Sequence, residues 1–178
     1  MGLNNQDIIL TPSFRAERVE IGNLYGFSRN TQVDEMSFIK IWVHIVFGTK
    51  NREQFLLKEI KEKVIQHIID NSHLKNIFID CINGYHDHLH CLISLGSDQN
   101  ISKVVNLIKG ESSYWINKNK ITRTKFEWAD EYFAVSVGES QVDSVRNYLK
   151  NQVEHHKKKN FLEEHDEFMN KYGFKFIP

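Results

Sequence analysis

The segment His88-Leu89-His90 places two imidazoles two positions apart within a run of apolar residues. Successive side chains of a strand point to opposite faces, so both imidazoles would share one face and Leu89 would enter the core on the other. Two imidazoles on one face can bind a single metal ion. The alternative is two polar residues on an exposed sheet face, because nine histidines in 178 residues make a chance His-x-His motif common.

Tyr148 and Gln152 form a second group, with the spacing of about one helical turn. Residues four apart on a helix share a face, so the phenol and the amide would lie close together. A positioned tyrosine hydroxyl can act as a covalent nucleophile, and an amide oxygen can complete a metal site. The alternative, which spacing alone favours, is that Tyr148 packs with Val145 and Leu149 in the apolar stripe of this helix.

Residues beside the histidine pair suggest further roles. His86 extends the run to His86-x-His88-x-His90, a pattern similar to that of histidine-triad nucleotide hydrolases. Those enzymes have apolar residues between the histidines, whereas Asp87 stands there in this chain. Asp87 is expected to shape a turn or to orient one of the histidines.

Three more residues are candidates of a weaker kind. Lys50 and Arg52 follow the first predicted strand and are candidates for contacts to phosphate groups. Alternatively, they belong to an ordinary polar loop. Asn151, next to Gln152, is a candidate for the layer of residues that surrounds the metal ligands.

The pattern of apolar residues predicts the elements that must position these side chains. Strands are expected over residues 40–49, 76–82, 88–95 and 132–137, and helices over residues 56–69, 101–117, 142–156 and 161–171. Asn83-Gly84 is typical of a hairpin turn. In the first strand, one face would carry Ile41, Val43 and Ile45 and the other Trp42, His44 and Val46.

This order of elements predicts an α+β, ferredoxin-like fold (β-α-β-β-α-β). Its sheet would be antiparallel and four-stranded, with two helices on one face and the first and third strands in the centre. A further C-terminal helix would carry Tyr148. Many unrelated functions share this fold, so the fold alone does not identify the chemistry.

Length and composition limit the class of protein. A chain of 178 residues with 40% hydrophobic side chains can bury one core. No apolar run approaches the roughly 20 residues that span a bilayer, and no secretory signal pattern opens the chain. Two cysteines, Cys81 and Cys91, are expected to be small core residues. We therefore expect a cytoplasmic protein without membrane association.

The charges balance overall but are unevenly distributed. Residues 36–125 carry 13 basic and 8 acidic side chains, which permits an anionic partner. Residues 1–35 are polar and lack a clear periodicity, and the patterned segment begins near Met36. We therefore divide the chain into residues 1–35, which are an N-terminal extension or the result of an upstream start, and a domain at residues 36–178 that begins at Met36.

Four segments, at residues 42–52, 84–93, 128–138 and 148–152, occur in the order found in one family. They contain a strand with a basic turn, an Asp-His-hydrophobic-His motif, a strand before a helix, and a Tyr-x-x-x-Gln motif. Together they resemble the single-tyrosine HUH transposases of the insertion-sequence-200/605 type. The resemblance covers about residues 36–173, so residues 1–35 lie outside it.

The resemblance implies a specific chemistry. His88, His90 and Gln152 would bind one divalent metal ion, Mg²⁺ or Mn²⁺, and Tyr148 would be the nucleophile. The substrate would be single-stranded DNA with a hairpin near the ends of an insertion sequence, cleaved and rejoined through a covalent 5′-phosphotyrosine. The protein would act as a homodimer. The segment from Gly138 to the catalytic helix is expected to be long enough for that helix to reach the partner's histidine pair.

Three alternatives remain open from the sequence. A domesticated relative would use the same chemistry on repeated extragenic palindromes. A histidine-triad-like nucleotide hydrolase would use His86, His88 and His90 and would form no adduct with DNA. A non-catalytic, ferredoxin-like RNA-binding module would require exposed aromatic residues on the sheet for base stacking.

Overall fold

The computed structural model describes residues 9–10, 39–152, 163, 166 and 170. Its elements are β1 (Ile9–Leu10), β2 (Ile41–Gly48), the 3₁₀ turn η1 (Lys50–Arg52), α1 (Lys58–Leu74), β3 (Phe78–Gly84), β4 (His88–Leu95), α2 (Ile101–Lys118), β5 (Phe133–Val137), the 3₁₀ turn η2 (Glu139–Gln141) and α3 (Val142–Lys150). The predicted strands and the first three helices are all present. The predicted helix at residues 161–171 lies outside the described residues, except that residues 163, 166 and 170 are helical.

The strands form one antiparallel sheet in the order β1-β3-β4-β2-β5. The strands predicted as central, β2 and β4, pair with each other from Ile41↔Leu95 to Gly48↔His88. The ferredoxin-like prediction is therefore confirmed. A fifth strand, β1, was not predicted; it adds two residues of the N-terminal segment to the edge of β3, pairing Ile9 with Ile82 and Leu10 with Cys81.

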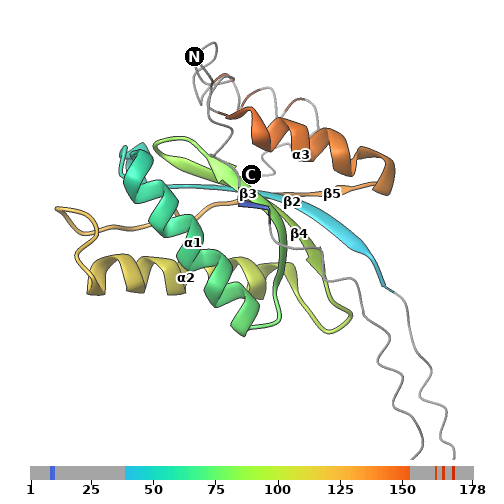
Figure 1. The fold of residues 1–178 in the computed structure, drawn as a ribbon, viewed down its shortest axis with the longest axis horizontal. Helices are drawn as coiled ribbons and strands as arrows, with labels where there is room; N and C mark the ends of the chain where they lie inside the picture. Colours follow the sequence, from blue (N-terminus) through green and yellow to red (C-terminus); the bar gives the residue numbers. More distant parts are fainter. Residues whose placement is uncertain (1–8, 11–38, 153–162, 164–165, 167–169, 171–178) are drawn as a thin grey trace, which may run out of the picture.

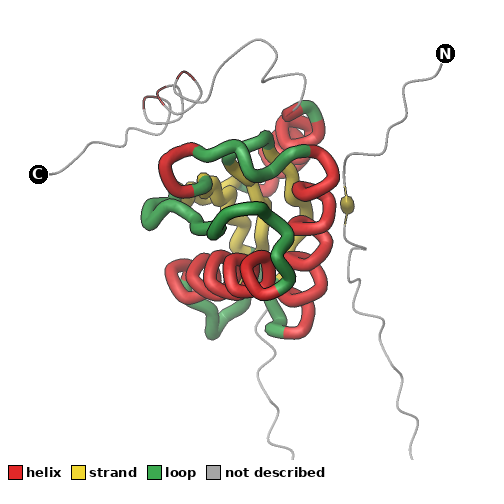
Figure 2. Tube along the Cα trace, turned by 90° about the vertical axis from the view of Figure 1, so that its left-hand side faces the viewer, coloured by secondary structure: helices red, strands yellow, loops and turns green. Residues whose placement is uncertain are grey.

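Helices cover both faces of the sheet (Figure 1). Helices α1 and α2 pack on one face, where the core includes Ile45, Leu89 and Cys91, each 0% exposed. Helix α3 lies on the opposite face. Figure 2, turned by 90°, shows the strands enclosed between these helices.

The alternation along β2 decides which side chains meet α3. Val43 and Ile45 belong to the core beneath α1 and α2, whereas Trp42 belongs to a second core beneath α3. This second core consists of Trp42, Cys81, Leu92, Val137, Val142 and Leu149. The predicted assignment of alternate residues to two faces is confirmed, and the polar residue His44 falls on the α3 side.

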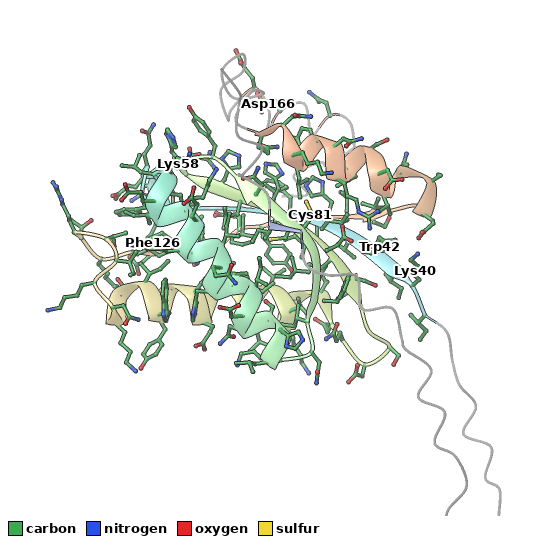
Figure 3. All side chains as sticks on the ribbon, viewed as in Figure 1. Lys40, Trp42, Lys58, Cys81, Phe126 and Asp166 are labelled. Atoms are coloured by element: carbon green, nitrogen blue, oxygen red, sulfur yellow. The ribbon has the colours of Figure 1, made fainter. Side chains whose placement is uncertain are left out.

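Both cysteines are core residues, as expected. Cys81 and Cys91 are 0% exposed and belong to the two different cores. In Figure 3, Cys81 lies between α3 and the sheet. Burial raises the pKa of the Cys81 thiol to about 12 and raises that of Cys91 further. Both thiols therefore remain protonated and unreactive in the folded chain.

The turn between β3 and β4 does not lie where the sequence predicted it. Asn83 and Gly84 are part of β3 and pair with His90 and Leu89. The turn consists of residues 85–87, closed by the bond from the Tyr85 N–H to the His88 carbonyl at 3.0 Å. Gly84 is required by close packing, because a Cβ there would lie 2.1 Å from the His88 carbonyl oxygen.

No helix in the described part of the chain is both long enough and apolar enough to cross a bilayer.

Candidate active site

His88 and His90 lie side by side on the face of β4 that α3 covers. Their ring centroids are 5.1 Å apart, and the two side chains are 0% and 1% exposed. Leu89, between them, points into the core beneath α1 and α2. The shared face predicted for the two histidines is confirmed, whereas the alternative of an exposed polar pair is wrong because α3 closes this face.

Asp87 orients His88. Its Oδ1 lies 2.7 Å from His88 Nδ1, and its Oδ2 accepts a hydrogen bond from Arg52 at 2.7 Å. Burial opposes ionisation of Asp87, but the bonds from His88 and Arg52 outweigh it and lower the pKa of the carboxyl group. A carboxylate can only accept, so Nδ1 of His88 carries the proton and Nε2 faces away with a lone pair.

His88 is kept neutral by its surroundings. Burial lowers the pKa of its imidazole, although the bond to Asp87 acts in the opposite direction. A neutral imidazole is the form that binds a metal ion. Asp87 and burial together therefore leave Nε2 of His88 as the nitrogen that could bind a metal ion.

His44, which the sequence did not identify as a site residue, contacts His90. Nε2 of His44 lies 3.1 Å from Nδ1 of His90, and the two rings stack with centroids 5.3 Å apart. His44 is 3% exposed. When His90 Nδ1 donates this bond, Nε2 of His90 has its lone pair available for a metal ion. A polar residue on the α3 face of an otherwise apolar strand was the available signal.

Tyr148 lies over this histidine group. Its ring centroid is 5.5 Å from that of His90 and 6.1 Å from that of His44, both in edge-on contacts. The ring also packs against the second core, next to Val145. Tyr148 therefore belongs to the apolar stripe of α3 and also contacts His90 and His44, and its role as nucleophile stays a prediction.

Gln152 lies beyond the end of α3, which corrects the prediction of one helix through residue 156. The helix ends at Lys150, and Asn151 leaves helical geometry at φ −99°, ψ 16°. Residues 153–156 lie outside the described residues. Gln152 is helical again and is 0% exposed. A single residue, Asn151, therefore interrupts the helix between Tyr148 and Gln152.

Two asparagine side chains explain where α3 ends. The Asn83 amide donates to the Leu149 carbonyl at 2.8 Å, and the Asn151 amide donates to the Asn147 carbonyl at 2.9 Å. The first bond gives the Leu149 carbonyl a partner in place of a further turn of helix. The second adds to the bond that the Asn147 carbonyl accepts from the Asn151 N–H at 3.2 Å. Asn151 is exposed, so its side chain serves the helix end.

The two histidines and Gln152 offer a donor set of two imidazoles and one amide oxygen. Each residue has other contacts, but Nε2 of His88, Nε2 of His90 and Oε1 of Gln152 are buried and make no hydrogen bond among the described residues. That part of the chain contains no group of three His, Cys, Asp or Glu residues placed for a metal ion, so within it a third ligand would be of another type, such as the Gln152 amide. Imidazole and oxygen donors suit Mn²⁺, and Mg²⁺ more weakly.

Helix α3 is fastened to the sheet by polar contacts at its first turns. Arg146 donates to both carboxylate oxygens of Asp80, at 2.8 and 2.6 Å. The Trp42 indole donates to Glu139 at 2.7 Å, and Figure 3 shows Trp42 on β2 below this end of α3. The segment from Gly138 to α3 contains only Gly138 and η2. The expected long connection is therefore wrong, because η2 turns the chain directly onto its own sheet.

The remaining candidates lie at the edge of this group. Arg52 is held by Asp87, and Lys50 is an exposed residue whose ammonium lies 3.4 Å from Glu127. The ring of His86 stacks on Tyr85 with centroids 4.0 Å apart. Among the described residues, the ring contacts of the site join His88 and His90 to His44 and Tyr148 and do not include His86.

Comparison with known proteins identifies the family. The family described as "Transposase IS200 like" matches residues 37–152. The transposase of insertion sequence IS200 from Salmonella typhimurium is 28% identical over 120 residues, covering 64% of this chain and 78% of the relative, and the transposase from Salmonella typhi matches equally.

Two solved structures share the fold. One, from Deinococcus radiodurans R1 and assigned as a transposase, has a TM-score of 0.54 at 19% identity and covers 72% of this chain and 98% of its own. The other is a REP-associated tyrosine transposase bound to a REP hairpin, with a TM-score of 0.52, 17% identity and 74% coverage of both chains. The family match spans most of the described residues, and the chain belongs to the IS200-like transposases.

Proposed function

We propose that this transposase cleaves and rejoins single-stranded DNA through a covalent bond between Tyr148 and a DNA 5′-phosphate. The observation that carries the proposal is the contact of the Tyr148 ring with His90 and His44, beside the buried ligand set of His88, His90 and Gln152. A nucleophile and a candidate metal site therefore lie together on one face of the sheet.

The reaction would proceed by exchange of one phosphodiester bond for another. The Tyr148 oxygen loses its proton and bonds to phosphorus, while the bond from phosphorus to the 3′-oxygen breaks and that oxygen gains a proton. A divalent cation, Mg²⁺ or Mn²⁺, bound by His88, His90 and Gln152 would neutralise phosphate charge and polarise a phosphoryl oxygen. Attack by the 3′-hydroxyl of another strand reverses the step and releases Tyr148.

Two features of the fold make the other classes of function less suitable. The RNA-binding alternative requires a sheet face open for base stacking, but α1 and α2 cover one face and α3 covers the other. The nucleotide-hydrolase alternative requires three histidines in one site, but His86 stacks on Tyr85 in the turn. The presence of Tyr148 beside the histidines favours covalent strand transfer.

A covalent adduct tests the proposal. Single-stranded DNA spanning the ends of the insertion sequence that encodes the chain, labelled at its 3′ end, should remain attached to the protein through denaturing electrophoresis when Mn²⁺ is present. The label must be at the 3′ end because Tyr148 retains the fragment that carries the 5′-phosphate. Tyr148→Phe should bind the DNA and form no adduct; an adduct in this variant would place the nucleophile elsewhere.

The natural substrate has two candidates. The similarity to the IS200 transposases supports the ends of an insertion sequence. The fold shared with a transposase bound to a REP hairpin supports, more weakly, a domesticated role on extragenic palindromes. Competition between the two oligonucleotides for adduct formation distinguishes these roles.

We also propose that the protein acts as a homodimer, because two DNA ends must be held while each chain offers one Tyr148. Since η2 directs α3 onto the sheet of its own chain, each protomer would contain a complete histidine and tyrosine site. Analytical ultracentrifugation with DNA should give a mass of two chains, and a mass near 21.0 kDa for the protein component would contradict this.

A further inference from the structure

Positive charge is concentrated in the segment that follows α2. Residues 118–125 contain four basic residues, Lys118, Lys120, Arg123 and Lys125, and no acidic residue. All four are exposed, and the side chain of Lys125 is 74% exposed. Figure 3 shows side chains that end in nitrogen projecting outward from this loop. The excess of basic residues between positions 36 and 125 is thus gathered largely on one loop.

The loop is held in a defined shape. The Asn117 side chain donates to the Phe126 carbonyl at 2.8 Å and accepts from the Phe126 N–H at 2.8 Å, which closes the loop onto the end of α2. Phe126 is 0% exposed, and the Trp128 indole donates to Ser112 at 2.9 Å. The basic side chains therefore project from a backbone that is ordered before any partner binds.

The far end of the loop is joined to the end of the sheet that carries the histidines. The Lys50 N–H donates to the Glu127 carbonyl, and the Ala129 N–H donates to the Gly48 carbonyl, both at 2.9 Å. Gly48 is the register partner of His88. The loop lies at the left in Figure 1 and faces the viewer in Figure 2. The loop therefore meets the sheet at the end where His88 lies, although the histidine pair itself faces α3 on the other side of the sheet. A strand that leaves the active site would pass around this end of the sheet to reach the loop.

An exposed aromatic residue accompanies the positive charges. Tyr114, on the last turns of α2, is 60% exposed, and the Lys118 ammonium lies 5.4 Å from its ring centroid. Burying such a ring in the core would stabilise the fold, but this one remains at the surface beside cations. An aromatic face next to basic side chains is the combination that binds single-stranded nucleic acid, since bases stack and phosphates pair with the cations.

We propose that Tyr114 and the basic loop at residues 118–125 form a contact surface for single-stranded DNA at the end of the sheet where His88 lies, on the side of α2. The inference rests on the proposed single-strand chemistry and adds a surface that would hold the part of the strand that extends away from the cleaved bond. Tyr114 would stack on a base, while Lys118, Lys120 and Arg123 would contact phosphates. Such contacts are independent of base sequence.

Binding of a fluorescently labelled single strand without self-complementarity, measured by anisotropy at several salt concentrations, tests this surface. Lys120→Gln with Arg123→Gln should weaken binding about tenfold at low salt and make the salt slope shallower by about 1.4, the value for two lost contacts to a single strand. Tyr114→Leu should weaken binding about tenfold, whereas Tyr114→Phe should retain most of the affinity because it keeps the ring.

The matched control is Lys75→Gln with Lys103→Gln. These exposed lysines lie after α1 and in the first turn of α2, and Lys103 is about 22 Å along the helix from Lys118. This variant loses the same charge and should bind nearly as the wild type does. Equal weakening in both double variants would show an effect of net charge and would overturn the proposal, as would wild-type affinity in the loop variants.

Two further outcomes separate this proposal from the proposed chemistry. If the loop variants lose affinity for a blunt duplex as strongly as for the single strand, the surface binds a duplex stem and the proposal is wrong. At limiting DNA the loop variants should form less Tyr148 adduct than the wild type, whereas the control Lys75→Gln with Lys103→Gln should form the wild-type amount. Weakened strand binding in the variants without any adduct in the wild type would retain the surface and reject the phosphotyrosine chemistry.

Discussion

Nε2 of His44 lies 3.1 Å from Nδ1 of His90, beneath α3 and almost fully buried. The bond fixes the plane of the His90 ring and selects which of its nitrogens faces the candidate metal site. His44 also contacts Tyr148, so one residue of β2 touches both the proposed nucleophile and a proposed ligand. We expect His44 to position these two groups.

Replacing His44 with Phe should keep the stacked ring and remove the hydrogen bond to His90. Loss of a residue that orients a ligand typically reduces metal affinity 10- to 100-fold, so we expect a decrease of about tenfold for Mn²⁺ by calorimetry. His86→Phe, in the turn outside the ring contacts of the site, is the control and should bind Mn²⁺ as the wild type does. Equal affinities for all three proteins would show that His44 has no part in metal binding.

Asp87→Asn should reduce Mn²⁺ affinity by about tenfold for a different reason. The amide retains the size of the side chain but removes the charge that attracts the His88 Nδ1 proton and the Arg52 guanidinium. Asp98→Asn, at an exposed carboxylate beyond the other end of β4, is the matched control. Unchanged affinity in Asp87→Asn would mean that packing alone orients His88.

The sequence predicted the sheet well because its information is local. Alternation along β2 and β4 assigns each residue to a face, and the side chain of Asn100 caps α2 by accepting from Ser102 and Lys103, close to the predicted start of that helix. Helix α1 continues to Leu74, five residues beyond the predicted end. The prediction ended too early because the last turn of this helix is polar and lacks an apolar pattern. The shared face of His88 and His90 followed from the same alternation.

The parts that were not predicted depend on contacts between distant segments. The end of α3 is determined by Asn83, which lies 66 residues earlier in the chain. The turn lies at residues 85–87 and not at Asn83-Gly84, because Asn83 is buried and pairs with His90 as part of β3. β1 has only two residues and is a strand because it pairs with β3. Periodicity carries no signal for such pairings.

The stability of the fold should decrease on acidification partly because of His67. Burial lowers the pKa of this imidazole, outweighing the effects of Glu111 and Asp70, and the ring stacks on Trp115 with centroids 4.2 Å apart. The unfolded chain then binds a proton near pH 6.5 that the folded chain binds only at lower pH, so the free energy of unfolding falls as the pH drops below about 6.5.

His67→Phe keeps the stack on Trp115 and removes this titration. Urea unfolding at pH 7.5 and pH 5.0 should therefore show a smaller loss of stability on acidification in the variant than in the wild type. His73→Phe, at an exposed position of the same helix, controls for the added ring. Identical pH dependence in His67→Phe and the wild type would exclude a contribution from His67.

Asn83 connects the far side of the sheet to the end of α3. Its side chain accepts from the Lys61 ammonium at 3.3 Å and from the Gly84 N–H at 2.8 Å, and it donates to the Leu149 carbonyl at 2.8 Å. Lys61 is only 7% exposed and also donates to the Gly84 carbonyl at 3.0 Å. The residue after Tyr148 is therefore tied to a buried polar network that begins on α1.

Asn83→Ala should destabilise the fold and impair the reaction separately. Three buried polar groups lose a partner, so the free energy of unfolding in urea should decrease by about 2–4 kcal/mol. Tyr148 and Gln152 flank the freed end of α3, so the rate of adduct formation should fall more than DNA affinity, measured where the variant remains folded. Asn106→Ala, at an exposed position of α2, should change stability by less than about 0.5 kcal/mol. A destabilised Asn83→Ala protein that forms the adduct at the wild-type rate would show that the network supports the fold without positioning Tyr148.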